Sequence, residues 1–378
     1  MLRPLFVAVV VLSVTEAAAA PAARQPTVDV AELVSGAALT FPESAEVVVL
    51  PTRAEAFDLD AEMQSFVAPL KDLRDSEQKL VMLLKAMDAR GLFSMDYAET
   101  TRTTSRTFHE RQGNCLSFTM LFIALARETG LTASYQNVEV PPTWTNDGQV
   151  VIAHHVNAVV RTGYNEETVV DFNIRDFEGQ QVRRRVSDEY ALGLFYNNLG
   201  AEALLRRDNG TAFEFLRAAT EAYPDMPGPW VNLGVLYARA GLHEHAEAAY
   251  LRAIETDDGE QSALVNLALV YESLGESELA AAYQQRVQKY RERNPYYHYS
   301  LAEHAVEEQR WEDALVSLRK AVRLKYDEPE FYTLRARALE ALGRGRDAAN
   351  SLAAAQEYAD VEKRRQSERV VFDALALR

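Results

Sequence analysis

The feature that most constrains this sequence is a repeat with a period of 34 residues, which begins at about residue 193. Small residues, mostly Gly and Ala, recur at the eighth, twentieth and twenty-seventh places of each unit, with large apolar residues between them. Small residues at this spacing let two antiparallel helices cross closely, so each unit is predicted to be a helical pair that stacks on the next. The five units follow one another without an insertion and start at Gly193, Pro227, Gln261, Pro295 and Pro329.

This pattern resembles the tetratricopeptide repeat, a helix–turn–helix unit of the same length. The resemblance implies an all-α solenoid over residues 193–362 that binds a protein partner on its concave face. Residues 363–378 are predicted to form a capping helix that closes the open end of the solenoid. The fifth and ninth places of each unit would line the concave face, and in the second and third units they are apolar: Val231, Val235, Val265 and Leu269.

Charge and spacing exclude several functions. The formal net charge is −16 over 378 residues, whereas nucleic acids and anionic membrane surfaces attract basic proteins. No Cys/His set has the spacing of a zinc site, and neither a phosphate loop nor a dinucleotide fingerprint occurs. We therefore expect no metal, no cofactor and no nucleic-acid partner.

The N-terminus is typical of an export signal. Met1-Leu2-Arg3 gives a short positive start, Leu5 to Val14 an apolar core, and Ala18-Ala19-Ala20 a cleavage site of small residues. The apolar core is too short to span a bilayer comfortably, and no later segment is long enough. Residues 1–20 are therefore predicted to be a signal peptide, and the mature protein to be soluble in the periplasm or secreted.

The predicted export limits the roles open to Cys115, which is the only cysteine in the sequence. Exported proteins of oxidising compartments use cysteines in pairs, so a lone one is a buried small hydrophobe, an intermolecular linker or a working thiol. Cys115 follows Gly113-Asn114 at the point where an apolar helical pattern begins. A helix start carries partial positive charge and unpaired N–H groups, which favour a reactive thiolate.

The segment around Cys115 is predicted to be α+β. A loop leads to a helix at about 115–129, and strands follow at 133–139, 151–161 and 167–172. The second strand holds His154 and His155, and Asp171 closes the third. A hairpin of adjacent antiparallel strands would bring His155 and Asp171 side by side, with the helix start packed against them.

Three short motifs resemble those of the transglutaminase-like branch of the papain-like fold, over residues 70–185: Gly113-Asn114-Cys115, His155-Val156-Asn157 and Val170-Asp171-Phe172-Asn173. The resemblance implies that Cys115 attacks an acyl carbon, that His155 moves the proton, and that Asp171 orients the imidazole. The backbone N–H of Cys115 would stabilise the oxyanion, together with Gln112 or Asn114. Members often carry an aromatic residue after the histidine and a proline near the aspartate, where this chain has Val156 and Phe172.

Several site residues have alternative interpretations. Successive strand residues face opposite sides, so only one of His154 and His155 points at Cys115. Val156, Ala158 and Val160 would share the core face with His154, which favours His155 as the base and leaves His154 at the edge of the cleft. Trp144 is expected either to wall the substrate cleft or to lie pinned on the surface. Asn114 supplies an oxyanion donor or shapes the turn.

The sequence thus predicts an α+β transglutaminase-like domain plus an all-α tetratricopeptide-repeat solenoid. Residues 21–69 would form a helical or irregular lead-in, and residues 70–190 the thiol domain. The expected function is an exported cysteine enzyme that acts on amide bonds of a peptide or protein, which the solenoid recruits. The alternatives are an inactive scaffold for protein–protein interactions in the cell envelope, and an acyl transferase that uses a small acyl donor.

Overall fold

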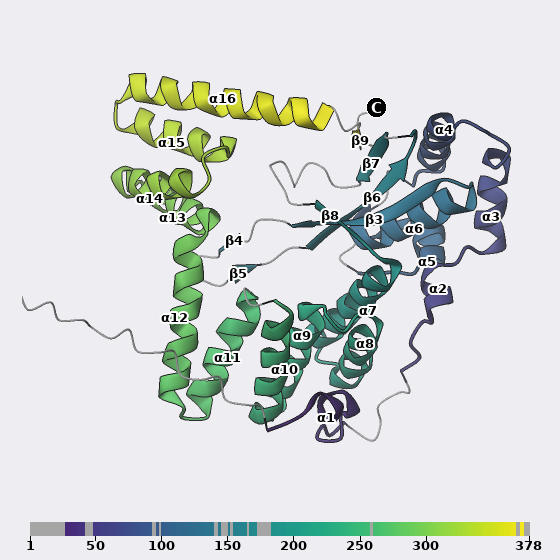
Figure 1. Cartoon of the computed structure of the whole chain (residues 1–378), viewed down its shortest axis with the longest axis horizontal. Coiled ribbons are helices and arrows are strands. Elements are labelled where there is room, and N and C mark those ends of the chain that lie inside the picture. Colours follow the sequence, from purple (N-terminus) through teal and green to yellow (C-terminus); the bar gives the residue numbers. More distant parts are fainter. Residues whose placement is uncertain are drawn as a thin grey trace, which may run out of the picture.

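An N-terminal α/β region with a small, mainly antiparallel sheet precedes an all-α repeat region (Figure 1). This computed structural model describes residues 27–41, 48–92, 96–97, 100–139, 143–144, 150–151, 154–164, 166–171, 183–257, 260–367 and 371–373. The predicted signal peptide lies outside the described residues. Within them, no helix has the length and apolar character needed to cross a membrane.

The helices of the N-terminal region are α1 (Val30–Ser35), α2 (Arg53–Phe57), α3 (Ala61–Val67), the short 3-10 helix η1 (Ala68–Leu70), α4 (Ser76–Ala89), α5 (Thr104–Glu110) and α6 (Cys115–Glu128). The strands are β1 (Asp96–Tyr97), β2 (Gln112–Gly113), β3 (Thr132–Glu139), β4 (Thr143–Trp144), β5 (Val150–Val151), β6 (His154–Arg161), β7 (Glu167–Asp171), β8 (Arg183–Val186) and β9 (Val371–Asp373). The predicted strand over 151–161 is therefore two strands, β5 and β6.

The main sheet has the strand order β8-β3-β6-β7-β9. β3, β6, β7 and β8 pair antiparallel, and β9 alone pairs parallel. Val156, Ala158 and Val160 of β6 are buried in one hydrophobic core with residues of α6, as the predicted alternation of core positions requires. His155 and Asn157 occupy the alternate positions of the same strand.

The described residues of the repeat region form the helices α7 (Asp188–Leu205), α8 (Asn209–Ala222), α9 (Pro227–Arg239), α10 (His243–Thr256), α11 (Gln261–Ser273), α12 (Ser277–Arg293), α13 (Pro295–Glu307), α14 (Trp311–Leu324), α15 (Pro329–Ala341) and α16 (Gly345–Ser367). The predicted starts of units two to five are the first residues of α9, α11, α13 and α15. Gly193, the predicted start of the first unit, lies inside α7. Each successive pair packs together, and the pairs form a curved array (Figure 1).

Glycine at the eighth place of a unit permits the close crossing of its two helices. A Cβ atom at Gly200 would lie 2.7 Å from Cγ of Leu216, and one at Gly234 would overlap the ring of Tyr250. Both glycines are buried. The units with alanine at this place bury it as well, at Ala268, Ala302 and Ala336.

The N-terminal and repeat regions share their cores instead of meeting at a linker. Phe195 of α7 and Ala219 of α8 belong to the same buried cluster as α6 and the sheet. The predicted lead-in divides between the two regions. Leu33 of α1 packs into the repeat core, where the hydroxyl of Tyr237 donates to its carbonyl oxygen at 2.5 Å, whereas Met63 of α3 lies in the core with α6.

The predicted capping helix over 363–378 is wrong at Val371–Asp373. α16 ends at Ser367, and Val371–Asp373 form β9, which pairs with β7 so that Asp373 lies in register with Asp171. β7 would otherwise be an edge strand with unpaired backbone N–H and C=O groups, and a short β-branched and aromatic segment suits such an edge. The C-terminal segment therefore returns to the sheet, and the chain closes on itself (Figure 1).

Gly234→Ala tests the close crossing of α9 and α10. The added methyl group forces the Tyr250 ring to move, which costs about 1–3 kcal/mol of unfolding free energy. Gly228→Ala is the matched control on the same helix, because its Cβ would make an ordinary 3.5 Å contact with Asn197. We expect Gly228→Ala to be neutral or stabilising by up to about 1 kcal/mol. Equal stability of the two variants in urea unfolding would contradict this account of the crossing.

Candidate functional site

Cys115 is the first residue of α6, and the turn before it is tightly specified. Arg111 ends α5 in the left-handed region with a φ of 52°. Asn114 then takes an extended conformation as the N-cap, and its side-chain oxygen accepts from the backbone N–H of Ser117 at 3.0 Å. A Cβ atom at Gly113 would lie 2.8 Å from Cβ of Ser117. Glycine is therefore required there, and the turn leaves the Cys115 side chain half-buried at the helix start.

His155 and Asp171 form a buried contact across the β6–β7 pair. Nε2 of His155 lies 2.8 Å from both carboxylate oxygens of Asp171. The amide of Asn157, two residues further along β6, donates to Oδ2 of the same carboxylate at 2.8 Å. His155 is only 1% exposed. The carboxylate is thus held from two positions of one strand, and it fixes the orientation of the imidazole ring.

The electrostatics of His155 also involve Cys115. Burial by itself would lower the pKa of His155, but hydrogen bonds to Asp171 and Cys115, and the charges of these two groups, raise the pKa to about 9. The imidazole therefore stays protonated at neutral pH, between a carboxylate and a thiol. The structure brings together the three residues Cys115, His155 and Asp171 that the sequence predicted as a site.

The two predicted oxyanion residues differ in their contacts. The side chain of Asn114 donates to Oγ1 of Thr101 at 2.7 Å and accepts from Ser117, so it shapes the turn, the second of its two predicted roles. Gln112 lies in β2 beside β1, and its side-chain oxygen accepts from Arg102 at 3.0 Å. The first backbone N–H groups of an α-helix have no acceptor within the helix, and that of Cys115 stays a predicted oxyanion donor.

The other two residues of the predicted cleft, His154 and Trp144, lie in strands. His154 opens β6 in register with Glu139 of β3. Trp144 lies in β4, which pairs with β5 and contacts α13 of the repeat region. The end of the sheet that carries His155 thus continues into two short strands that lie between the sheet and the repeats (Figure 1). Phe172 and Asn173 of the third motif lie outside the described residues.

Two residues near the site were not assigned a role from the sequence. Asn157 was named in the second motif without a role, yet its side chain donates to Asp171; its place two residues from His155, on the same strand face, was the available signal. Thr101 contacts Asn114 and donates its backbone N–H to Glu202 of α7 at 2.7 Å. No signal in the sequence linked Thr101 to Glu202, because the contact spans 101 residues.

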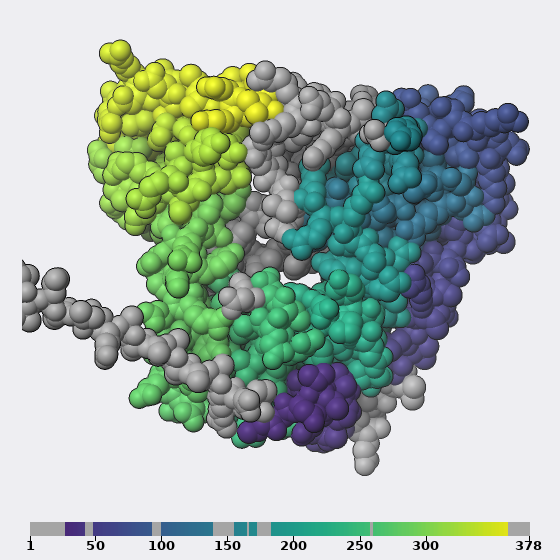
Figure 2. Space-filling view, viewed as in Figure 1, coloured from purple at the N-terminus to yellow at the C-terminus, as the bar shows by residue number. Residues whose placement is uncertain are grey.

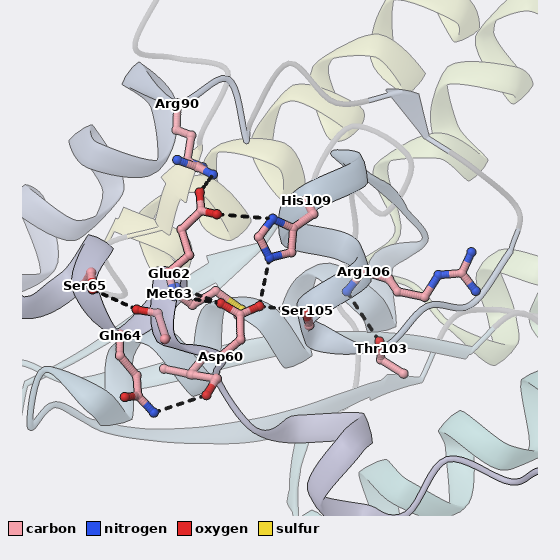
Figure 3. A network of polar contacts seen from close by, with 12 residues as sticks. Asp60, Glu62, Met63, Gln64, Ser65, Arg90, Thr103, Ser105, Arg106 and His109 are labelled. Carbon is pink, nitrogen blue, oxygen red and sulfur yellow. Dashed lines mark hydrogen bonds and ion pairs between the residues drawn. The ribbon is translucent and has the colours of Figure 1, made fainter.

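A second polar cluster holds α5, the helix that leads into the Cys115 turn (Figure 3). Asp60 caps α3 and accepts from Oγ of Ser105 at 2.7 Å, while Nε2 of His109 lies 2.8 Å from the same carboxylate. Burial would raise the pKa of Asp60, but hydrogen bonds from Ser105, the backbone of Met63 and His109 lower it to about 2. Within the described residues, no group of three or more His, Cys, Asp or Glu side chains could hold a metal ion.

The molecule has two limbs that face each other. The space-filling view shows the N-terminal α/β region and the last repeats as opposite limbs, joined through the first repeats (Figure 2). α7 belongs to the core of one limb and begins the array that forms the other. The contact of β4 with α13 spans the space between the limbs.

Comparison with known proteins identifies the repeats. A tetratricopeptide-repeat family model matches residues 228–259 and 261–294, which are the second and third units. The C-terminal half of the chain therefore carries tetratricopeptide repeats, as predicted. The curated proteins compared with the chain give no match.

Three solved structures with some likeness each match less than half of the chain. A crystal structure of MamA protein is 18% identical, with a TM-score of 0.25, and the match covers 46% of this chain and 94% of that one. YrrB, described as a TPR protein with an unusual peptide-binding site, is 15% identical over 44% and 86%, with a TM-score of 0.25. PilF of Pseudomonas aeruginosa is 18% identical over 46% and 78%, with a TM-score of 0.27.

Asp60→Asn tests the cluster around α5. Asn still caps α3, but it removes the charge that Ser105 and His109 contact. Because the pKa of Asp60 falls from 3.8 to about 2 on folding, its contribution to stability is present above pH 4 and is lost as the pH falls towards 2. We expect the free energy of unfolding in urea to be about 0.5–1 kcal/mol lower for the variant than for the wild type at pH 6, and equal for the two near pH 2.

Asp75→Asn is the control for this measurement. Asp75 caps α4 through the backbone N–H of Gln78, as Asp60 caps α3, but no histidine contact is found for it among the described residues. The difference between wild type and Asp75→Asn should therefore vary less with pH. If Asp60→Asn lowers the free energy of unfolding by the same amount from pH 6 to pH 2, the stabilising role of the Asp60 charge is contradicted.

Proposed function

We propose that the chain is a cysteine enzyme that acts on amide bonds of a peptide or protein, through a Cys115–His155–Asp171 triad in a transglutaminase-like domain. The observation that carries this proposal is the buried imidazole of His155, which contacts the carboxylate of Asp171 and the thiol of Cys115. A structural cysteine needs neither partner. Three groups of these types in mutual contact are the arrangement that activates a thiol nucleophile.

The roles follow from the geometry. Cys115 is the nucleophile, and the protonated imidazole of His155 and the helix N-terminus both stabilise negative charge on its sulfur. The sulfur attacks the acyl carbon, and the backbone N–H of Cys115 donates to the oxygen as it gains charge. His155 then gives its proton to the leaving amine, and an acyl-thioester remains on Cys115. Water or a second amine releases the acyl group while His155 accepts the incoming proton.

Asp171 and Asn157 act on the ring and not on the substrate. The carboxylate contacts Nε2 of His155, so in this proposal Nδ1 is the ring nitrogen that exchanges a proton with the thiol. Asn157 donates to this carboxylate and limits its rotation. Because all three side chains are buried, their hydrogen bonds are stronger than they would be in water, and the ring is held in one orientation.

The repeats supply the binding part of the proposal. Tetratricopeptide repeats indicate a protein partner, and β4 of the N-terminal region contacts α13 of the repeats. We infer that the repeats present a polypeptide substrate to Cys115, and that Trp144 in β4 lies on the path between them. The predicted export of the chain belongs to the same proposal and places the substrate in the periplasm or outside the cell.

A second candidate function is a scaffold for protein–protein interactions in the cell envelope, with an inactive thiol domain. The match of the repeats to a protein-binding family favours it. So do the departures Val156-Asn157 and Phe172 from the transglutaminase-like pattern. An acyl transferase with a small acyl donor would use the same triad, and it differs from the first proposal only in its substrate.

Alkylation of Cys115 by iodoacetamide separates an activated thiol from a structural one. His155 keeps its proton up to about pH 9, so the wild type should react at pH 6–7, well below the ordinary thiol pKa of about 8.5. His155→Ala removes the neighbouring positive charge, and we expect alkylation at pH 6.5 to slow by at least about tenfold. The rate constant is measured by mass spectrometry from pH 5 to pH 10.

His109→Ala is the matched control, because His109 also contacts a carboxylate but lies outside the candidate site. Its alkylation profile should equal that of the wild type. If the wild type reacts slowly when folded, like an ordinary thiol when unfolded, and identically in His155→Ala, the enzyme proposal fails and the scaffold is favoured.

Product analysis separates hydrolysis from transfer. The chain is incubated with a mixture of unfolded proteins and a fluorescent primary amine. Both routes release the leaving amine when the acyl-thioester forms, but hydrolysis leaves a free carboxylate on the acyl fragment, whereas transfer joins the fluorescent amine to that fragment through a new amide bond. Hydrolysis is expected to predominate, because water outnumbers any amine in an open cleft. Cys115→Ser, which removes the thiolate but keeps the size of the side chain, should abolish both products.

A further inference from the structure

One segment within the last repeats carries more basic than acidic residues. The chain as a whole has a formal net charge of −16, yet the segment 317–350 contains eight Lys and Arg residues and only five Asp and Glu residues. This segment covers the end of α14, all of α15 and the start of α16. A basic patch on an acidic protein creates a local field that attracts anionic groups. The proposed enzyme activity makes no use of this charge.

Three arginines of this segment converge on one groove. The groove has a volume of about 360 Å³ and lies where α14, α15 and the turn into α16 meet. Leu315 and Leu339, both buried, give it an apolar floor. Its charged lining residues are Arg319, Arg335, Arg344 and Asp347. The groove therefore combines positive charge with an apolar surface.

The three arginines differ in the contacts that they make with other side chains. Nε of Arg335 donates to Oγ of Ser351 at 3.0 Å, and its guanidinium lies 4.7 Å from the centre of the Tyr332 ring. Arg344 donates to Asp347 at 2.8 and 3.1 Å, so the one carboxylate of the groove is engaged. Within the described part of the chain, Arg319 takes part in no ion pair or side-chain hydrogen bond. Two positive charges thus remain without a carboxylate partner.

We propose that this groove binds the carboxylates of an acidic polypeptide segment that also carries apolar residues. Guanidinium groups match carboxylates through paired, charge-assisted hydrogen bonds. Contacts with Tyr332 and Ser351 hold Arg335 in place before a ligand arrives, which lowers the entropy cost of binding. Leu315 and Leu339 provide the surface on which an apolar side chain of the segment packs.

The groove is separate from the face that the resemblance predicts for peptide binding. Arg335 and Leu339 occupy the seventh and eleventh places of the fifth unit, whereas Thr333 and Arg337 occupy the concave fifth and ninth places. The chain would therefore bind an acidic partner at its last repeats independently of any substrate near Cys115. A duplex nucleic acid or a membrane needs an extended basic surface, and a single groove on a chain of net charge −16 does not supply one.

Fluorescence anisotropy of a labelled peptide with the sequence Glu-Leu-Glu-Glu-Leu-Glu tests this proposal on the full chain. We expect the wild type to bind it at 50 mM salt, more weakly at 200 mM, and not to bind the counterpart with Lys in place of Glu. Arg319→Ala should weaken binding about tenfold. Arg337→Ala, an equal charge change on the other face of α15, should leave the affinity within about twofold.

Arg335→Ala should weaken the affinity by at least as much as Arg319→Ala, and circular dichroism shows whether each variant is folded. Because Arg319 is exposed, its substitution keeps the test valid even if Arg335→Ala unfolds. Equal affinity of the wild type and Arg319→Ala for the acidic peptide overturns the proposal. So does stronger Arg319-dependent binding of inorganic phosphate, duplex DNA or anionic vesicles than of the peptide. Cys115→Ser should bind the peptide unchanged, so that loss of the enzyme proposal does not affect this result.

Discussion

The rest of the structure depends on one continuous hydrophobic core, which α6 shares with the sheet and with α7 and α8. Burial of apolar surface at about 25 cal/mol per Å² is the main stabilising term available to such a fold. Because α6 is buried along most of its length, its first residue, Cys115, has a fixed position relative to β6 and β7. The same core includes Phe195 and so sets the direction in which the repeats leave the sheet. The candidate site and the protein-binding region are therefore held by the same packing.

Within this core, the two ionisable side chains His155 and Asp171 are buried as a pair. A buried charge without a partner costs several kcal/mol, and a pair is tolerated when further hydrogen bonds complete it. Asn157 completes the His155–Asp171 pair in this way. At the start of α6, the side-chain amide of Asn114 donates a hydrogen bond to the hydroxyl of Thr101. The backbone N–H of Thr101 in turn donates to Glu202 of the first repeat. These hydrogen bonds link the turn before Cys115 to α7.

The repeats are stabilised mainly by contacts between neighbouring units, as expected for a stacked array. Such an array leaves most of its surface free to vary, and here the charge changes along it. The middle units place apolar residues at the concave positions, whereas the last units gather arginines on another face. The return of β9 to β7 adds a contact between the two ends of the chain that a simple array does not have. The C-terminal end of α16 points towards the edge of the sheet where β9 pairs with β7 (Figure 1).

The sequence by itself determined the features that depend on local periodicity and turn chemistry. A period of 34 residues located the starts of α9, α11, α13 and α15, the glycine turn located Cys115 at a helix start, and strand alternation selected His155, which the structure pairs with Asp171. Only the tertiary structure decided that Val371–Asp373 form a strand, that α1 packs on the repeats, and that Asn157 supports the triad. Local patterns specify which surface a segment must bury. Which distant surface or strand edge receives it depends on the fold of the whole chain.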